Sequence, residues 1–475
     1  MSTITEADKL APDVDGVGRI EAHGIDFIPE SERRGKARDL FAVWAAPNVS
    51  YLALVVGGAL VLMGLQLWQA IAVIVVGNLV SIPVGVIAAS GAASGTPSEV
   101  IMRAMFGVHG NRVNIAITGW LISVCYLAMN WAAAAATGFA LADRFGIPVN
   151  TVTKIVIIVA IAAVTLVLAV YGHATIVRVY VPLTLALITV FAMLAYFVIG
   201  HAVWSYDPPP LTGVELFGTL TAGTALVASG PLSYSNSADF ARYLPSNTSV
   251  ASITWWTTIG MFVPSVLFTS IGSIAATAVD MTDPQTGLEG VLPDWFVPVF
   301  LVAVIVGTVA NNAMTAYSSG LALQAVGLRL RRSVSVLLDG TVGIALTLYA
   351  LLVSNFIDTI SNLMQFIVVV TGPVIAIYTT DLVLRRNRYD GLQVSDETSA
   401  SPFWYVGGVN PAGFVALIVS SAAAILCVSA PDFTGPVASA MSDVDLSLPV
   451  GMVLASVIYG TMMASTIRRQ IGVAA

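Results

Sequence analysis

Runs of about twenty apolar residues recur along most of the chain, and this pattern restricts the fold more than any other feature. About twenty residues of α-helix, at roughly 1.5 Å of rise each, cross the hydrocarbon core of a bilayer. The sequence therefore predicts an all-α polytopic membrane protein with about 12 transmembrane helices. We expect these helices near 40–64, 67–89, 113–140, 153–170, 180–200, 215–236, 251–279, 295–325, 334–353, 358–383, 411–429 and 447–467.

The composition agrees with a chain whose surface faces lipid. The 475 residues are 57% hydrophobic and 10% charged, whereas a soluble chain is about 25% charged. The net charge of -7 and the lack of a basic stripe disfavour binding to nucleic acid. Cys125, Cys427 and the four histidines show no spacing typical of metal ligands, so we expect no metal and no cofactor.

Lysine and arginine residues mark one side of the predicted membrane protein. With twelve spans and a cytoplasmic N-terminus, the cytoplasmic segments hold all of the twenty basic residues, Lys9 in the tail included, except Arg144 and Lys154. This asymmetry follows the positive-inside rule. The first forty residues are polar and lack a short apolar region followed by a small-residue cleavage site, so we expect no signal peptide. We therefore expect a multi-pass protein of the cell membrane with both termini in the cytoplasm.

Two spans contain helix-breaking residues at comparable positions. The first span holds Pro47 and Asn48, and the sixth holds Gly230 and Pro231. Interrupted helices are tolerated in lipid where neighbours or a water-filled cavity satisfy the freed backbone groups. The two spans are five apart, so a second group of five helices would run inverted relative to the first, as in many transporters. The alternative is that each residue pair only kinks its helix.

The predicted repeats divide the chain into four parts. We expect residues 1–39 to form a cytoplasmic N-terminal tail, 40–200 the first five-helix repeat, 201–390 the second, inverted repeat, and 391–475 helices 11 and 12 with a short cytoplasmic C-terminus.

The spans offer polar but uncharged groups for a ligand. The eighth span carries Asn311 and Asn312, and an amide in lipid needs partners that a ligand can supply. Lys and Arg are absent from mid-span positions, which favours a neutral, planar solute. Trp120 in the third span is a candidate to stack on it, or else a ring that faces lipid.

An ordered set of short motifs resembles the nucleobase:cation symporter-1 transporters, and within them the purine-cytosine permease-like branch. The motifs span nearly the whole chain: Gly77-Asn78, Phe106-Gly107, Gly119-Trp120, Ala238-Asp239-Phe240-Ala241-Arg242-Tyr243-Leu244-Pro245, Ala310-Asn311-Asn312, Tyr317-Ser318-Ser319-Gly320, and Gly372-Pro373 to Asp381. The resemblance implies a leucine-transporter-like fold of two inverted five-helix repeats plus two extra helices. It also implies uptake of purines, cytosine, hydantoins, allantoin or related vitamins, driven by sodium or protons.

The resemblance also implies roles for individual residues. It assigns stacking on the flat ring to Trp120, a second wall of the site to Ser229 and Gly230, and a substrate contact to Asn311. We add the adjacent Asn312 to the predicted substrate-binding residues. Backbone carbonyls at the first-span break coordinate the ion in sodium-coupled members, and the matching positions are Ala46 and Val49.

The chain departs from the family pattern in three ways. Val124 replaces an amide one turn after the stacking Trp, and Gly230 replaces an aromatic ring, which leaves space for a larger solute or for Tyr234 to fold in. Ile305 and Val306 match a Ser-Thr pair of sodium-coupled relatives, and their side chains cannot ligate a hard cation.

Proton coupling is therefore slightly favoured over sodium coupling. A proton carrier needs a buried titratable group, and Asp339 and Asp239 are the candidates. The alternatives are structural ion pairs: Asp239 with Arg242, and Asp339 with Arg331 or Arg332.

The sequence thus predicts a secondary active symporter that imports a nucleobase-like solute such as cytosine or a purine. Its predicted partners are that small molecule, a coupling cation and the lipid bilayer, with no nucleic acid and no obligatory protein partner. Another neutral heterocycle in the same fold, such as hydantoin, allantoin or a vitamin precursor, is the alternative. A passive channel is another. A membrane-embedded enzyme is disfavoured because no span carries paired acids or a zinc motif.

Overall fold

The computed structural model describes residues 16–282, 284–352, 356–430 and 433–473, of which 356–366 and 473 are described by their backbone alone. Lys9 and residue 353, the predicted end of the ninth span, lie outside the described residues.

Nine segments of the described chain are long and apolar enough to cross a membrane. They are formed by α3 (Leu67–Asn78) with α4 (Ser81–Ser94), α7 (Val108–Ile115) with η3 (Ala116–Leu121) and α8 (Ile122–Arg144), α9 (Thr151–Tyr171), α10 (His173–His201), α13 (Val250–Ala275), α15 (Val297–Ala325), α16 (Arg332–Leu352), α17 (Phe356–Arg385) and α21 (Ser447–Val473). The bent pair α1 (Asp39–Asn48) and α2 (Tyr51–Leu62), the 20-residue α11 (Gly213–Leu232) and the shorter α19 (Pro411–Leu426) complete the series. These segments follow the order of the predicted spans.

Short elements connect the long helices. They are η2 (Glu30–Glu32), α5 (Ser98–Ile101), α6 (Arg103–Phe106), α12 (Ala238–Ala241), α14 (Pro284–Glu289), α18 (Gly391–Ser395), α20 (Pro436–Ala440) and an antiparallel pair of two-residue strands, β1 (Ser429–Ala430) and β2 (Phe433–Thr434).

The first span is broken, but the break follows the proline. Pro47 lies inside α1, the helix ends at Asn48, and α2 starts at Tyr51 with an axis bent by 56°. Ser50 caps α2 by accepting a hydrogen bond from the Ala53 N–H at 3.3 Å. In the sixth span, α11 likewise continues through Gly230 and Pro231 to Leu232 before the chain turns. Both breaks therefore lie one or two residues later than the sequence predicts.

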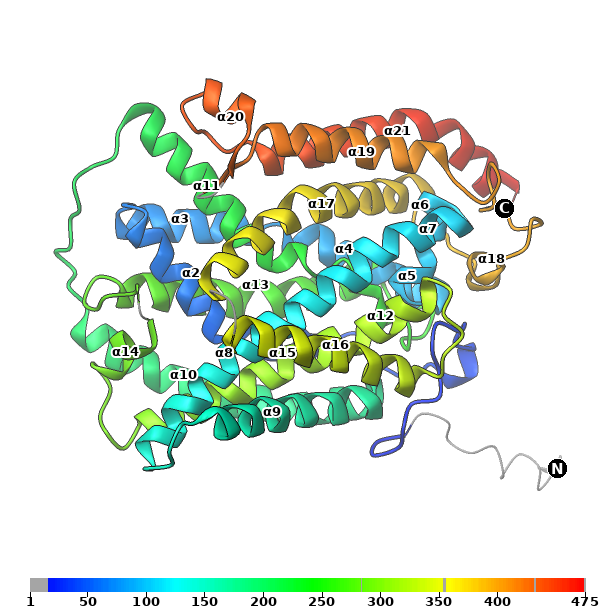
Figure 1. Cartoon of the computed structure of the whole chain (residues 1–475). Coiled ribbons are helices and arrows are strands. Elements are labelled where there is room, and N and C mark those ends of the chain that lie inside the picture. The colour runs from blue at the N-terminus through cyan, green and yellow to red at the C-terminus, as the bar shows by residue number, and fades with distance from the viewer. Residues whose placement is uncertain (1–15, 283, 353–355, 431–432, 474–475) are drawn as a thin grey trace.

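The long helices pack side by side around the broken pair (Figure 1). α8, α9 and α16 pack against α15, while α19 and α21 pack against α17 on the opposite side of the molecule. α2 and α13 approach so closely that a Cβ on Gly57 would lie 1.8 Å from the Thr269 carbonyl oxygen, and one on Gly272 would lie 2.0 Å from that of Leu54. Glycine is needed at both positions because the two backbones touch.

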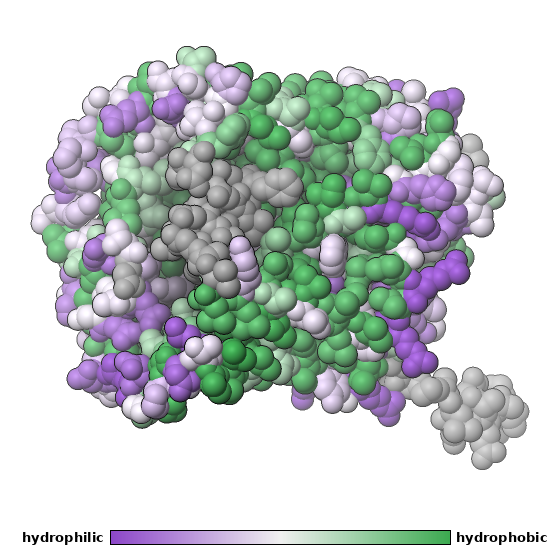
Figure 2. Space-filling view, viewed as in Figure 1, coloured by the Kyte–Doolittle hydropathy of each residue, from purple (hydrophilic) through white to green (hydrophobic). Residues whose placement is uncertain are grey.

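The two ends of the helical bundle are chemically distinct from its middle. Figure 2 shows hydrophobic side chains across the middle of the view and hydrophilic ones toward both ends. One end carries both described termini, α5, α12 and α18, and we call it the termini face (Figure 1). There Glu397 binds Arg103 at 2.6 Å and Arg112 at 3.0 Å. At the other end, with α14, Arg144 binds Asp294 at 3.1 Å.

Candidate functional site

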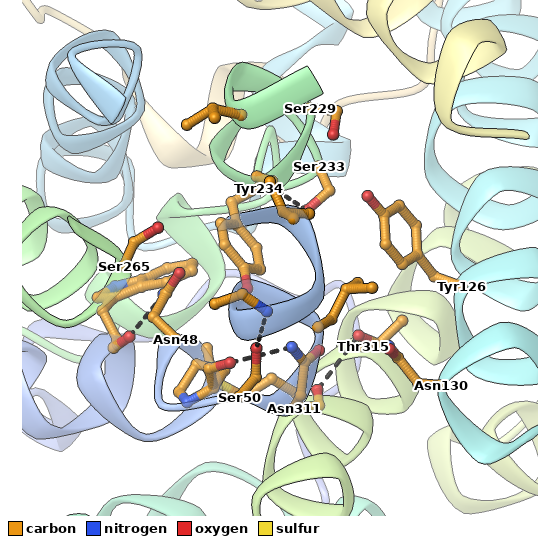
Figure 3. A pocket seen from close by; sticks show the side chains of 18 of the residues that line it. Asn48, Ser50, Tyr126, Asn130, Ser229, Ser233, Tyr234, Ser265, Asn311 and Thr315 are labelled. Atoms are coloured by element: carbon orange, nitrogen blue, oxygen red, sulfur yellow. Dashed lines mark hydrogen bonds between the residues drawn. The ribbon is translucent and has the colours of Figure 1, made fainter. Parts of the chain in front are cut away.

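A cavity lies where the α1–α2 break meets α8, α11, α13 and α15 (Figure 3). Its lining combines aromatic rings, amides and hydroxyls with apolar side chains. The lining residues are Trp44, Pro47, Asn48, Ser50, Leu52, Ala53, Val56, Ile122, Ser123, Tyr126, Asn130, Leu226, Val227, Ser229, Gly230, Ser233, Tyr234, Asn236, Phe240, Ser265, Thr269, Asn311, Met314 and Thr315. None of these lining residues carries a charge.

Asn311 joins the broken first span to α15. Its Nδ2 donates to the Pro47 carbonyl oxygen at 3.1 Å, a carbonyl that the end of α1 leaves without an intrahelical partner. Asn48 Nδ2 donates to the Trp44 carbonyl oxygen at 2.8 Å, which secures the last turn of α1. The break is thus held open by side-chain amides, as a membrane-embedded interruption requires.

Aromatic rings form the wall of the cavity nearest the termini face. The Tyr234 ring meets Trp44 edge to face at a centroid distance of 5.0 Å, and Trp44 meets Phe240 in the same way at 5.8 Å. The Tyr234 hydroxyl lies beside the Asn311 amide. The wall is therefore apolar in body and polar at the Tyr234 tip, which suits a flat ring with polar edges.

Three polar atoms of the cavity lining have no hydrogen-bond partner within the described residues. They are Trp44 Nε1, the Tyr126 hydroxyl and Asn236 Oδ1, and all three are buried. An unpaired buried polar atom costs about 1–3 kcal/mol. The hydroxyl can donate or accept, and the amide oxygen accepts, so the pair can bind a solute that offers both N–H and carbonyl groups.

The structure brings several predicted site residues together. Ser229, Gly230, Tyr234 and Asn311 all line the cavity, together with the break residues Pro47 and Asn48. A Cβ built on Gly230 would meet nothing within 4 Å, so this position leaves open space beside the cavity wall. Pro231 is buried behind it.

Two predicted site residues are used elsewhere. The Asn312 side chain is fully buried against α8, where its Nδ2 donates to the Leu127 carbonyl oxygen at 3.0 Å and its Oδ1 accepts from Asn130 at 2.9 Å. Trp120 is not among the lining residues. Trp120 lies on the π-helical turn between α7 and α8, and its indole Nε1 donates to Asp339 Oδ1 at 2.6 Å.

The residues matched to a sodium site lie at the break of the first span and on α15. Ala46 and Val49 are buried at the break, and the α15 residue that faces the Val49 carbonyl oxygen is Gly307, whose built Cβ would lie 3.0 Å from it. Ile305 packs toward Gly138 of α8 instead. Val306, the other matched residue, packs against the apolar cluster that contains Val49.

The two candidate proton carriers are buried but do not form the expected ion pairs. Asp239 accepts hydrogen bonds from the Ser98 N–H at 2.9 Å and the Ser318 hydroxyl at 2.6 Å. The ion pair of Arg242 is with Glu21, and within the described residues neither Arg331 nor Arg332 pairs with Asp339.

Sequence reasoning missed several lining residues. Ser123, Tyr126 and Asn130 lie at spacings of three and four on one face of α8, a signal the sequence contains. Ser233 and Asn236 lie within the predicted sixth span, 215–236, and the structure places them after the end of α11 at Leu232.

Comparisons with known proteins agree with this architecture. Residues 27–451 match a family of permeases for cytosine/purines, uracil, thiamine and allantoin. YxlA of Bacillus subtilis (strain 168), a candidate purine-cytosine permease by name, is 27% identical over 466 residues, covering 96% of this chain and 98% of that protein.

Two solved structures of Mhp1 share the fold. Mhp1, a nucleobase-cation-symport-1 family transporter, in a closed conformation with bromovinylhydantoin bound, gives a TM-score of 0.74 at 18% identity, covering 97% of this chain and 96% of the other. Its inward-facing conformation gives 0.71 at 19% identity, with 95% and 96% covered.

Proposed function

Because the chain belongs to the family of permeases for cytosine/purines, uracil, thiamine and allantoin, we propose that it imports a nucleobase-like solute such as cytosine or a purine. It is a multi-pass membrane transporter of the nucleobase-cation symport-1 family, and not an enzyme. Its fold is the leucine-transporter-like arrangement of two inverted five-helix repeats plus two further helices. We propose both the identity of the solute and the identity of the coupling cation from the chemistry of the cavity and of the buried side chains.

The observation that carries the choice of solute is the chemistry of the cavity. Its walls offer amides, hydroxyls and aromatic rings without a single charged side chain. A charged solute would have to leave water without a counter-charge, which is costly. A neutral heterocycle loses less hydration free energy when it leaves water. Tyr126, Asn236 and Asn311 can bind its polar edge, and Tyr234 and Trp44 can cover its face.

A proton is the cation that this chain best supports. The α15 residue facing the Val49 carbonyl oxygen is Gly307, which offers no side-chain oxygen. The neighbouring Thr308 hydroxyl donates to the Val304 carbonyl oxygen at 2.8 Å. Gly307 therefore supplies no side-chain oxygen to a sodium ion at the break, whereas Asp239 and Glu99 are buried carboxyl groups at the termini face that can carry a proton.

The proposed orientation places the termini face in the cytoplasm of a cell. The basic residues of the connections support this choice through the positive-inside rule. Import then moves the solute from the α14 end toward the end that carries α5 and α12.

Uptake in a host that lacks its own permeases tests the proposal. We expect saturable uptake of at least one of labelled cytosine, adenine and hypoxanthine, with competition by hydantoin or allantoin reporting on the alternative solutes.

Gly230→Leu should raise KM because it fills open space at the cavity wall. Gly200→Leu is the matched control, since Gly200 in α10 also has nothing within 4 Å of its built Cβ but lies outside the cavity. No saturable uptake of any planar heterocycle would refute the proposal.

A further inference from the structure

A group of five ionisable side chains is buried at the termini face, where the N-terminal segment meets the helices. Each member is at most 3% exposed. The members, which we call the buried charge network, are Glu21, Glu99, Asp239, Arg242 and Arg332.

Glu21 occupies the centre of one half of this network. Its carboxylate binds Arg242 at 3.1 Å and Arg332 at 3.4 Å. It also accepts hydrogen bonds from the Tyr243 hydroxyl at 2.5 Å and the Tyr317 hydroxyl at 2.9 Å. Glu21 is thus fully supplied with donors and cations.

Glu99 and Asp239 form the other half of the network, and Asp239 has more hydrogen-bond donors than Glu99. Asp239 accepts from the Ser98 N–H and the Ser318 hydroxyl. Glu99 lies against Asp239, and its Oε2 is buried without a hydrogen-bond partner in the described chain. A proton on Glu99 would supply the donor that this contact between two carboxyl groups lacks.

The charge count of the network also requires a proton. Two guanidinium groups are buried with three carboxyl groups, so the network is neutral only when one carboxyl group is protonated. An unbalanced buried charge is strongly unfavourable. Burial and the neighbouring Asp239 carboxylate both raise the pKa of Glu99 well above its ordinary value. For Glu21, burial alone would raise the pKa, but Arg332 and Arg242 outweigh it and hold the pKa below the ordinary value.

Two other titratable side chains, those of His173 and Tyr378, lie around the network. His173 of α10 stacks on Tyr243 with ring centroids 4.2 Å apart, and its ring nitrogen is 3.2 Å from the Phe240 carbonyl oxygen. Tyr378 of α17 is hydrogen-bonded to Ser90 at 2.9 Å. His173 lies beside Glu21 and Arg242, and Tyr378 lies beside Asp239 and Glu99. Among the described residues, neither is hydrogen-bonded to Glu99.

The Glu99–Asp239 pair lies between elements that must separate for the termini face to open. Asp239 on α12 is bonded to Ser98 on α5 and to Ser318 on α15. The Asp239 N–H also donates to the carbonyl oxygen of Asn236, which lines the cavity, at 3.1 Å. The pair therefore lies one helical turn from the cavity and at a junction that rocking of one repeat against the other would break.

We propose that Glu99 and Asp239 form the proton-binding site of transport. The pair holds one proton while the termini face is closed, and opening admits water that takes it. In this step the Glu99 O–H bond breaks and the proton passes to a water molecule, leaving two hydrated carboxylates. The inference rests on the proposed function and assigns its coupling cation to named residues.

Proteoliposomes that contain the full chain and an internal pH-sensitive dye test this assignment, with cytosine as the probe. An inward cytosine gradient should acidify liposomes with the unsubstituted protein. Glu99→Gln should keep exchange of labelled cytosine for unlabelled cytosine but lose the acidification, because a fixed neutral amide carries no proton. Glu215→Gln, an exposed residue at the start of α11, is the matched control and should acidify normally.

The outcomes separate this inference from the proposed function. Equal acidification by Glu99→Gln, or cytosine movement by the unsubstituted protein without protons, overturns the proton site but not the transport. Absence of cytosine exchange in the unsubstituted protein counts against the proposed substrate instead. If that occurs, or if Glu99→Gln does not fold, infrared spectra of the unsubstituted protein with isotope-labelled glutamate test whether a buried glutamate is protonated. A protonated glutamate band at neutral pH supports the site, and its absence overturns it.

Discussion

Asn311 and Asn312 are adjacent in sequence but act on different sides of α15. Successive helical residues point about 100° apart, so Asn311 reaches the break of the first span while Asn312 binds α8. The sequence predicts that amides in this span matter. It does not say which amide faces the cavity, because that depends on which helices pack on each side.

Replacing Asn311 by Ala should weaken transport without removing the protein from the membrane. The substitution leaves the Pro47 carbonyl unpaired and removes an amide from the cavity, at a cost of about 1–3 kcal/mol, or roughly 5- to 150-fold in KM or kcat/KM. Uptake kinetics with protein quantified in the membrane measure this. Thr341→Ala, an exposed hydroxyl on α16, should change nothing. An Asn311→Ala variant with unchanged kinetics would mean that the solute binds elsewhere.

Trp120 is the residue for which sequence and structure differ most. Its position in the third span predicts a ring over the solute, and Trp120→Ala is expected to abolish transport. In the structure, the indole donates to Asp339, which is 219 residues away in sequence. No local pattern reveals such a long-range hydrogen bond, because it depends on the packing of α8 and η3 with α15 and α16.

A double-mutant cycle on Trp120 and Asp339 measures this contact. Trp120→Phe keeps an aromatic ring but removes the N–H, and Asp339→Ala removes the acceptor. We expect a coupling energy of about 1.5–3 kcal/mol in thermal stability if the acceptor is charged. A coupling energy near zero would show that the hydrogen bond contributes nothing.

Among the elements, the broken spans were predicted from their prolines, but their end points were not. Pro47 removes only its own N–H, so α1 continues to Asn48 before the chain departs from helical geometry. The second span is also interrupted, between Asn78 and Ser81, and this break is not among the predicted ones. Pro83 in the first turn of α4 cannot donate to the Leu79 carbonyl oxygen, which accounts for the position of the interruption.

The contact of α2 with α13 gives a prediction at the scale of elements. Gly272→Ala should destabilise the protein by at least about 1–3 kcal/mol, because the added methyl group would overlap the Leu54 backbone. Gly200→Ala in α10 meets open space and should be neutral or slightly stabilising. Thermal unfolding in detergent compares them, and equal melting temperatures for the two variants would contradict the observed packing.

The described part of the predicted N-terminal tail, residues 16–39, packs against the helices instead of lying in solvent. Glu21 and Arg33 are buried, and the Ile28 N–H donates to the Gly95 carbonyl oxygen at 2.8 Å. The sequence shows only a polar stretch with a basic cluster, which is typical of a tail. Burial arises because Arg242 and Arg332 converge on Glu21 from distant parts of the chain.

Removing the Glu21 charge should destabilise the protein in a pH-dependent way. Glu21→Gln leaves two buried cations without their counter-charge, at about 3–5 kcal/mol. The pKa of Glu21 is held below its ordinary value of 4.5. Its stabilisation is therefore complete above that value and is lost as the pH falls through the lower folded pKa. We expect a constant stability difference from neutral pH down to the ordinary value, and a shrinking one below it. A difference that grows on acidification would contradict this account.

For the molecule as a whole, the span order and the separation of charges were predictable because both are periodic along the chain. Apolar runs define the helices, and ion pairs such as Arg103–Glu397 and Arg144–Asp294 form at opposite ends of the bundle. The cavity and the buried charge network were only partly predictable. Each is assembled from side chains on several helices, and Glu99 gave no signal beyond being an acid after the second span.

Gradient-driven accumulation in proteoliposomes tests the central claim, cation-coupled transport of a nucleobase-like solute, most directly. With an inward proton gradient, labelled cytosine, adenine or hypoxanthine should accumulate above its external concentration. A protonophore should abolish this accumulation, and replacing sodium by choline at fixed pH should leave it unchanged. Strict sodium dependence would contradict the choice of proton. Uptake that never exceeds equilibration under any cation gradient would contradict symport itself.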